Sequence, residues 1–341
     1  MRKKIFKVLT TMVVFFAAST NCFAADYVTA VVKDNLRFFL YNDNTATVTS
    51  YSGEPVEIII PTTVEYSGST YNVTAIGDNV FKGCKSLKKI KLNVQTIGVC
   101  TFESCTNLSE IDFTNVQFIG GGAFRWCKSI SNLSCPDVIE VGECAFESSS
   151  LISITLPKAK SLSIRPFWYC ESLKQIEIPE VTEIGKSAFS YCNSLKVANL
   201  PKVSVIWNSA FSNCPSLEVI AMPMITGLKT NSVNCPSLKI VKVGNTIVPI
   251  DSSTFDEKIY STATLYVPTG MKEKYMQNEN WAKFWNIEEY NLVGGVNDVQ
   301  ADASAAPATY YDLNGNKFDT PRQGINIVVD ADGNASKQVF K

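Results

Sequence analysis

A phenylalanine that returns every 21 or 22 residues constrains the fold of this 341-residue chain more than any other feature of its sequence. The series comprises Phe81, Phe102, Phe124, Phe146, Phe167, Phe189, Phe211 and Phe255, with Val233 in the one unit that lacks the ring. Internal repetition at a period of roughly 20 to 50 residues indicates an architecture in which equivalent units stack on their neighbours. The repeated region is therefore predicted to form one continuous stack rather than several separate globular domains.

Each unit carries the same pattern around its phenylalanine, I-G-x-x-A-F-x-x-C-x-S-L-x-x-I-x-L-P. A cysteine follows the phenylalanine by three residues in most units, Ser149 replaces it in one, and Cys235 comes one residue early in another. The segment Ile164-Arg165-Pro166 interrupts the I-G-x-x-A part once. This interruption and the replacement of the phenylalanine by Val233 are expected to change local packing without ending the stack.

The I-x-L part of the pattern predicts a short β-strand, because strand side chains point to opposite faces in alternation. The A-F-x-x-C part is expected to form a helical or 3₁₀ turn on the outer side, with the phenylalanine buried against the strands. The proline that ends most strands removes a backbone donor and blocks further pairing at that point. Equivalent strands of successive units would then hydrogen-bond into a parallel sheet.

Over roughly residues 40 to 290, this pattern resembles that of the BspA-like leucine-rich repeat family of bacterial surface proteins. Tyr41–Gly77 looks like the family's lead-in of small β-hairpins, and Leu265–Glu288 looks like its closing strand and tryptophan-bearing helix. The resemblance implies an α/β repeat fold, a right-handed leucine-rich-repeat solenoid of short parallel strands and helical or 3₁₀ turns. It also implies β-rich caps, a small C-terminal β tail, and adhesion or binding of host components at the bacterial surface.

The chain is predicted to begin with a secretory signal peptide at residues 1–24. A basic start precedes an apolar run, and small residues follow at Ala24 and Ala25, where cleavage is expected. The apolar run is far shorter than the roughly 20 residues that span a bilayer, so a transmembrane anchor is not expected. Lipidation of Cys22 is an alternative that the preceding residues match poorly. The further segments are expected to be an N-terminal β cap at 25–70, the solenoid at 71–264, a C-terminal cap at 265–290 and a linker at 291–308.

The last segment, residues 309–341, is expected to form a small β tail, because it holds two strand-like runs separated by turn residues. It resembles the C-terminal sorting domains of exported Bacteroidetes proteins. A small β cap with no addressing role is the alternative. We therefore expect a secreted or cell-surface protein, which such a tail could attach to the outer membrane.

The composition excludes several classes of function. The chain contains no histidine, so it cannot build a Ser-His-Asp triad, a Cys-His pair or a histidine-ligated metal site. Without the four basic residues of the signal peptide, 27 lysines and arginines face 32 acidic residues, a net charge of −5. A mildly acidic chain without a basic block is a poor candidate for binding nucleic acid.

Eleven cysteines in an exported chain raise the question of disulfides or metal ligation. Most recur at one repeat position, which favours buried thiols that pack as small hydrophobes. We expect no metal and no cofactor. Glu110 and Asp112 lie on one predicted strand at a separation that glycoside hydrolysis could use, but nothing in the sequence provides an acid with a raised pKa. An enzyme is not expected.

Residues between the inward positions of the predicted strands form an outward face that could bind a partner. Its charged candidates are Lys89, Lys91, Glu110, Asp112 and Glu177. Its apolar candidates form a predicted strip, Val197, Val219, Ala221 and Ile240. A soluble monomer seldom leaves such a strip uncovered, so either a protein partner binds it or a loop or the C-terminal cap covers it.

Aromatic residues hold equivalent positions on three of the predicted outer turns, Trp126, Tyr169 and Tyr191. They could stack on sugars, or they could pack between adjacent turns. The leading prediction is a non-catalytic extracellular protein that binds a protein partner, such as a host matrix or surface component, through a solenoid face. A glycan-binding surface protein for nutrient capture is the alternative, and a purely structural surface-layer role is third.

Overall fold

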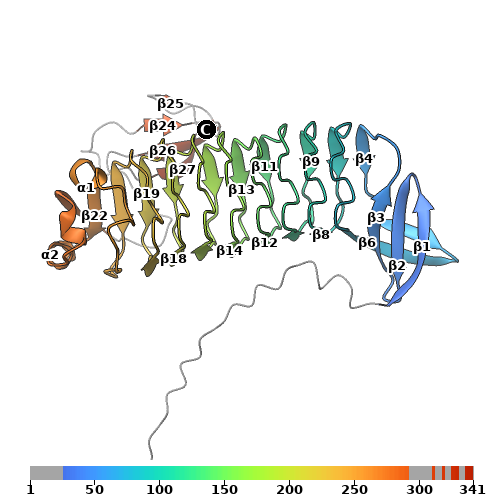
Figure 1. Ribbon diagram of the computed structural model, residues 1–341, viewed down its shortest axis with the longest axis horizontal. Helices are drawn as coiled ribbons and strands as arrows, with labels where there is room; N and C mark the ends of the chain where they lie inside the picture. The colour runs from blue at the N-terminus through green and yellow to red at the C-terminus, as the bar shows by residue number, and fades with distance from the viewer. Residues whose placement is uncertain (1–25, 292–308, 312–316, 319–323, 330–334, 341) are drawn as a thin grey trace, which may run out of the picture.

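The computed structural model describes residues 26–291 and the backbone of four strands between residues 309 and 340. Residues 26–291 form one elongated stack of units (Figure 1). The stack starts with the antiparallel strands β1 (Tyr27–Lys33), β2 (Leu36–Tyr41) and β3 (Thr45–Tyr51), in that order. The hairpin of β5 (Thr63–Tyr66) and β6 (Ser69–Ile76) follows, and β6 pairs in parallel with β3.

Each repeat contributes two short strands, which lie on opposite edges of the stack (Figure 1). The first row consists of β4 (Glu57–Ile59), β7 (Lys89–Lys91), β9 (Glu110–Asp112), β11 (Asn132–Ser134), β13 (Ser153–Thr155), β15 (Gln175–Glu177), β17 (Val197–Asn199), β19 (Val219–Met222) and β21 (Ile240–Val243). These are the strands predicted from the I-x-L segments. Their pairing is parallel and in register, as in Leu133 opposite Ile154 opposite Ile176.

The second row of strands was not predicted. It consists of β8 (Thr96–Ile97), β10 (Phe118–Ile119), β12 (Glu140–Val141), β14 (Ser161–Leu162), β16 (Glu183–Ile184), β18 (Val205–Ile206) and β20 (Gly227–Leu228). These strands continue the sheet of the N-terminal cap into a single 12-stranded sheet. The solenoid of parallel strands is confirmed, but the described residues are mostly strand, and the α/β assignment is not confirmed.

The A-F-x-x-C segments form turns, not the expected helical or 3₁₀ turns. Two residues of most turns have a positive φ, as at Gly122 (63°) and Trp126 (60°), which is outside the helical region. Their backbone N–H groups therefore donate to the next unit and not within their own turn: Gly122 to the carbonyl of Glu143 at 2.8 Å, and Trp126 to that of Glu147 at 2.9 Å. The turns thus form a hydrogen-bonded ladder of their own.

The phenylalanines stack as a continuous column through the interior. From Phe81 to Phe211 successive ring centroids lie 5.1 to 5.5 Å apart and the planes differ by 15° at most. All of these rings are fully buried. Offset stacking of aromatic rings adds to the free energy that their burial supplies. Rows of leucine and isoleucine from the two strands of each unit complete the core.

The repeat cysteines have a hydrogen-bonding role. Six of the buried thiols donate to the carbonyl of the phenylalanine one unit earlier, as in Cys170 to Phe146 at 3.1 Å and Cys214 to Phe189 at 3.0 Å. This bond gives the buried carbonyl oxygen one more hydrogen-bond partner. A residue of similar size that has no donor could not supply that partner. The ten cysteines of the described chain are free thiols, eight of them buried, and their burial raises the pKa of Cys170 to about 12.

The C-terminal end of the stack continues the first row with β22 (Thr264–Pro268) and β23 (Asn286–Tyr290). Between them lie the short helices α2 (Lys272–Met276) and η2 (Trp281–Lys283), and α1 (Ile259–Thr262) precedes β22. Trp281 is fully buried, and its indole N–H donates to the carbonyl of Val248 at 2.7 Å. Trp281 therefore covers the apolar interior at the C-terminal end of the stack.

The tail contains β24 (Thr309–Tyr311), β25 (Lys317–Phe318), β26 (Gly324–Val329) and β27 (Ala335–Phe340), which pair as an antiparallel sheet in the order β25-β24-β26-β27. The expected signal peptide, residues 1–24, and linker residues 292–308 lie outside the described residues. Within the described residues, no helix has the length and apolar character to cross a bilayer.

Candidate binding surfaces

The outward side of the first strand row, which we call the strand face, brings three of the four predicted apolar residues into line. Val197 lies opposite Val219 on the next strand, and Val219 lies opposite Ile240. Each is half-buried by its neighbours. Adjacent strands are about 4.8 Å apart, so these side chains form a contiguous apolar row. Ala221 lies two residues along β19, between Asn199 and Lys242.

The other end of the strand face is charged. Lys89 Nζ lies 3.5 Å from Glu57 Oε1 and 3.7 Å from Glu110 Oε2, which makes a line of alternating charge across β4, β7 and β9. Lys91 lies in register beside Asp112. Glu57 was not among the predicted residues, although Glu57-Ile58-Ile59-Ile60-Pro61 carries the strand-and-proline ending of the repeat. The phenylalanine and cysteine of the repeat pattern are missing before this segment, so its strand was not recognised as the first of the row.

The predicted carboxylates do not form an acid–base pair. Asp112 accepts hydrogen bonds from the hydroxyl of Thr114 at 2.6 Å and from its backbone N–H at 3.0 Å, and these bonds lower the pKa of Asp112. A carboxyl group with a lowered pKa is ionised near neutral pH and is not a proton donor. Glu177 lies farther along the strand face, where Thr155 donates a hydrogen bond to it at 3.4 Å. Within the described residues, no cluster of three or more Cys, Asp or Glu is placed to hold a metal ion.

The opposite surface, which we call the turn face, carries Trp126, Tyr169 and Tyr191 at equivalent positions. The rings of Tyr169 and Tyr191 stack on each other, with centroids 4.2 Å apart and planes 4° apart. Trp126 is separated from them by the unit that carries Ser148, and the guanidinium of Arg125 lies 4.6 Å from the centroid of its ring. The two tyrosines therefore pack between turns, and the three aromatic residues do not form one platform.

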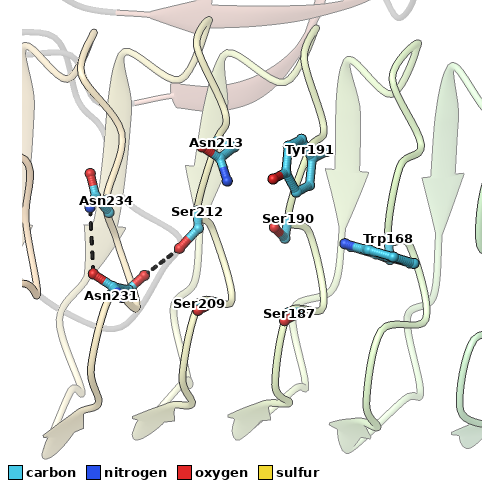
Figure 2. Close-up of a pocket in the computed structure, with 9 residues that line it drawn as sticks. All are labelled: Trp168, Ser187, Ser190, Tyr191, Ser209, Ser212, Asn213, Asn231 and Asn234. Carbon is cyan, nitrogen blue, oxygen red and sulfur yellow. Dashed lines mark hydrogen bonds between the residues drawn. The ribbon is translucent and has the colours of Figure 1, made fainter.

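A shallow hollow of about 310 Å³ lies beside Tyr191 on the turn face (Figure 2). Its lining side chains come from four successive units and all are neutral: Trp168, Ser187, Ser190, Tyr191, Ser209, Ser212, Asn213, Asn231 and Asn234. The Ser212 hydroxyl donates to the carbonyl of Asn231 at 2.7 Å. Tyr191 was a predicted candidate, but none of the serines and asparagines of this set was predicted, because the lining residues share no motif within any one unit.

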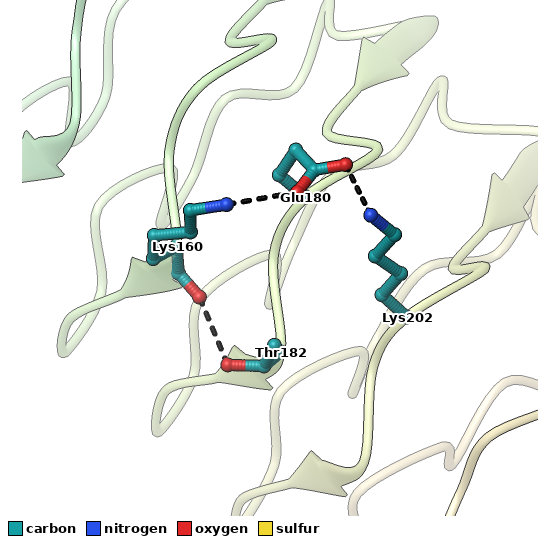
Figure 3. Close-up of polar contacts among 4 residues, drawn as sticks. All are labelled: Lys160, Glu180, Thr182 and Lys202. Atoms are coloured by element: carbon teal, nitrogen blue, oxygen red, sulfur yellow. Dashed lines mark hydrogen bonds and ion pairs between the residues drawn. The ribbon is translucent and has the colours of Figure 1, made fainter.

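A line of alternating charge crosses the loops between the two strand rows. Glu180 accepts from Lys160 at 2.8 Å and from Lys202 on the other side (Figure 3). Hydrogen bonds from the two ammonium groups lower the pKa of Glu180 to about 2. One carboxylate thus joins three successive units.

Replacing Glu180 by glutamine is expected to lower Tm slightly near neutral pH and to leave it unchanged below about pH 2. The pKa of this carboxyl is depressed on folding, so the stability that it contributes is complete above the ordinary glutamate range. That contribution is lost as pH falls through about 2. Thermal unfolding by circular dichroism across this pH range measures the effect, with Glu177→Gln as the control. A decrease that persists in about 1 M NaCl, where the Debye length is about 3 Å, would contradict the ion-pair explanation.

Comparison with known proteins supports the repeat assignment. The family model described as "BspA type Leucine rich repeat region (6 copies)" matches residues 62–170 and 160–280. A leucine-rich repeat protein from Bacteroides ovatus ATCC 8483 is 21% identical, with a TM-score of 0.57 and 76% of each chain covered. A leucine rich cell surface protein from Faecalibacterium prausnitzii A2-165 is 23% identical, with a TM-score of 0.43, covering 78% of this chain and 96% of that one.

The leucine-rich repeat protein of T. pallidum is also 23% identical, with a TM-score of 0.42, covering 58% of this chain and 86% of that one. No curated protein matches the sequence. The family model spans well over half of the chain, and the Bacteroides ovatus structure shares its fold. The chain belongs to the BspA-type leucine-rich repeat family.

Proposed function

We propose that this protein binds a protein partner outside the cell through its strand face. The observation that carries the proposal is the apolar row of Val197, Val219 and Ile240, which are opposed in register on three adjacent strands. A few apolar residues near the centre of a contact commonly supply most of its binding free energy. Leucine-rich repeat proteins of this family are in general non-catalytic binding scaffolds, which agrees with this role.

The charged end of the strand face would set the orientation of the partner. The alternating Glu57, Lys89 and Glu110 side chains are exposed, and exposed charges at an interface affect association rate and specificity more than affinity. Lys91, Asp112 and Glu177 would contribute in the same way. A partner that covers both ends of the face would need an apolar centre and a mixed-charge edge.

We place the protein at the cell surface or in the secreted fraction. The basic and apolar pattern of residues 1–24 supports export, and the tail at 309–341 supports a sorting role by its resemblance to such domains. A host extracellular matrix or surface component is then the expected class of partner. The remaining proposed boundaries are a β cap at 25–70, the solenoid at 71–264, a second cap at 265–290 and a linker at 291–308.

The double substitution Val219→Ser and Ile240→Ser is expected to weaken partner binding at least about 10-fold, or about 1.4 kcal/mol. The reason is that both side chains would lose apolar contact with the partner while the inward core residues stay in place. Surface plasmon resonance against an array of purified extracellular matrix proteins measures the effect. Met224→Ser is the matched control, because Met224 is apolar and 60% exposed but lies on a loop outside the strand face. Equal affinity of the double variant and the wild type would rule out the strand face.

A second candidate function is glycan binding on the turn face. The observation that favours it is the neutral hollow beside Tyr191, where hydroxyl, amide and aromatic groups are gathered without a charged side chain. It involves a different surface from the protein-binding proposal, so the two functions can be tested separately.

A further inference from the structure

We propose that the hollow bounded by Trp168, Tyr191 and Asn234 binds a neutral, linear carbohydrate. This inference rests on the second candidate function and names its residues and its class of ligand. Four features of the hollow support a sugar ligand: the chemistry of its lining, the fixed position of its rings, the aromatic side chain at the Tyr191 turn and the periodic arrangement of its polar groups.

The lining matches an uncharged ligand with many hydroxyl groups. Its nine side chains provide hydroxyls and amides, which both donate and accept hydrogen bonds, and an indole N–H, which donates. An anionic or cationic ligand would find no opposite charge in the lining. A sugar needs donors, acceptors and a flat apolar surface together, and this hollow has all three.

The two aromatic rings are held in place before any ligand arrives. One face of the Tyr191 ring stacks on Tyr169, and the opposite face of the Tyr191 ring takes no part in this stack. Trp168 meets the edge of Tyr169 with centroids 4.6 Å apart, and the guanidinium of Arg165 lies 5.0 Å from the Trp168 centroid. Figure 2 shows the nitrogen end of the Trp168 indole directed toward Ser190. Rings that are already fixed lose little conformational entropy when a ligand binds.

The backbone at Tyr191 indicates that the ring has a purpose beyond forming the turn. Tyr191 has a φ of 63°, a conformation that is unfavourable for a bulky residue. Equivalent turns are made by Gly83, Ser104 and Asn213, so the turn itself does not require an aromatic side chain. Trp126 and Tyr169 have the same conformation, with φ of 60° and 57°, so the positive φ belongs to the turn, and the aromatic side chain at residue 191 is the feature that the turn does not explain.

The polar groups repeat along the axis of the stack. Ser187, Ser209 and Asn231 occupy one column of equivalent positions, and Ser190 and Ser212 lie in a second. Columns of this kind repeat at about 4.8 Å, the spacing of adjacent units. A chain of sugar units lying along the axis would therefore meet similar donors and acceptors at each step. The volume of about 310 Å³ is at the small end of ligand pockets, which fits one or two sugar units and an open continuation.

The test is binding of the full mature chain to an array of neutral and anionic oligosaccharides, followed by calorimetry with the best neutral oligosaccharide. Trp168→Ala and Asn213→Gly are each expected to weaken binding at least about 10-fold. Glycine keeps the positive φ of 58° at residue 213 and removes the amide. Asn213 is exposed, so this variant remains informative if Trp168→Ala fails to fold. Trp126→Ser is the control, since Trp126 is an exposed aromatic on the same face and outside the hollow.

Each outcome has a distinct meaning. Binding of a neutral oligosaccharide that is lost in Trp168→Ala and Asn213→Gly and kept in Trp126→Ser supports the proposal. Glycan binding that both hollow variants retain overturns this site but leaves glycan binding as a function. Binding to anionic glycans alone overturns this site but leaves glycan binding as a function. Binding to no glycan overturns the site and the second candidate function together.

Discussion

Replacing Phe167 by alanine will lower the free energy of unfolding by about 3 to 5 kcal/mol, because the surrounding column cannot close the cavity. Phe167 is fully buried, and its ring stacks between Phe146 at 5.5 Å and Phe189 at 5.2 Å. Units of a solenoid contact only their neighbours, so a defect in the middle is also expected to separate unfolding into two transitions. Urea unfolding followed by circular dichroism measures both effects.

Trp285→Ala is the matched control for this prediction. Trp285 is 83% exposed, so removing its larger ring should change the free energy of unfolding by no more than about 0.5 kcal/mol. A loss below about 1 kcal/mol at Phe167 would show that the phenylalanine column does not hold the units together.

The second large effect is the protection of the thiols. In the native mature chain, Ala25 to Lys341, near pH 8, the eight buried cysteines are expected to remain unreactive toward Ellman's reagent, while all ten cysteines of that chain react after denaturation in guanidinium. Burial raises the pKa of Cys105 and Cys170 to about 12. Only about one thiol in ten thousand would then be the reactive thiolate at that pH, and access is blocked as well.

Cys100 and Cys144 are the internal comparison for the thiol experiment. Both lie on the turn face and are partly exposed, so they are expected to react before the others, although slowly, because desolvation also raises their pKa values. Rapid reaction of most native thiols would contradict the buried hydrogen-bonded role. Fewer than ten thiols after denaturation would indicate disulfides.

The phenylalanine period and the strand alternation were enough to predict the stack and its first row of strands. Ile154 and Ile176 could be assigned to the interior because alternate strand residues face opposite sides, whatever the neighbouring units do. The same alternation predicted which residues face outward, and so the line of Val197, Val219 and Ile240 could be written down before the pairing register was known.

The second strand row and the turns could not be predicted in the same way. Strands such as Thr96–Ile97 are two residues long, and only pairing with the next unit makes them strands. The turns were expected to be helical because A-F-x-x-C has helix-like spacing. The residues at positive φ, Gly83 and Asn213 among them, were the available signal against a helix.

The hollow on the turn face was missed for a related reason. Trp168 and Asn234 are 66 residues apart and belong to different units, so no local spacing connects them. The stacking of the units brings these two residues close together. The sequence of any single unit shows only an aromatic residue or an asparagine on an outer turn.

The measurement that tests the central claim most directly is binding of the mature chain, Ala25 to Lys341, to parallel arrays of extracellular matrix proteins and glycans. The result we predict is saturable binding to at least one protein, lost in the variant carrying Val219→Ser and Ile240→Ser and kept in Met224→Ser. Absence of binding to every protein on the array, or protein binding that the double variant retains in full, would contradict recognition through the strand face.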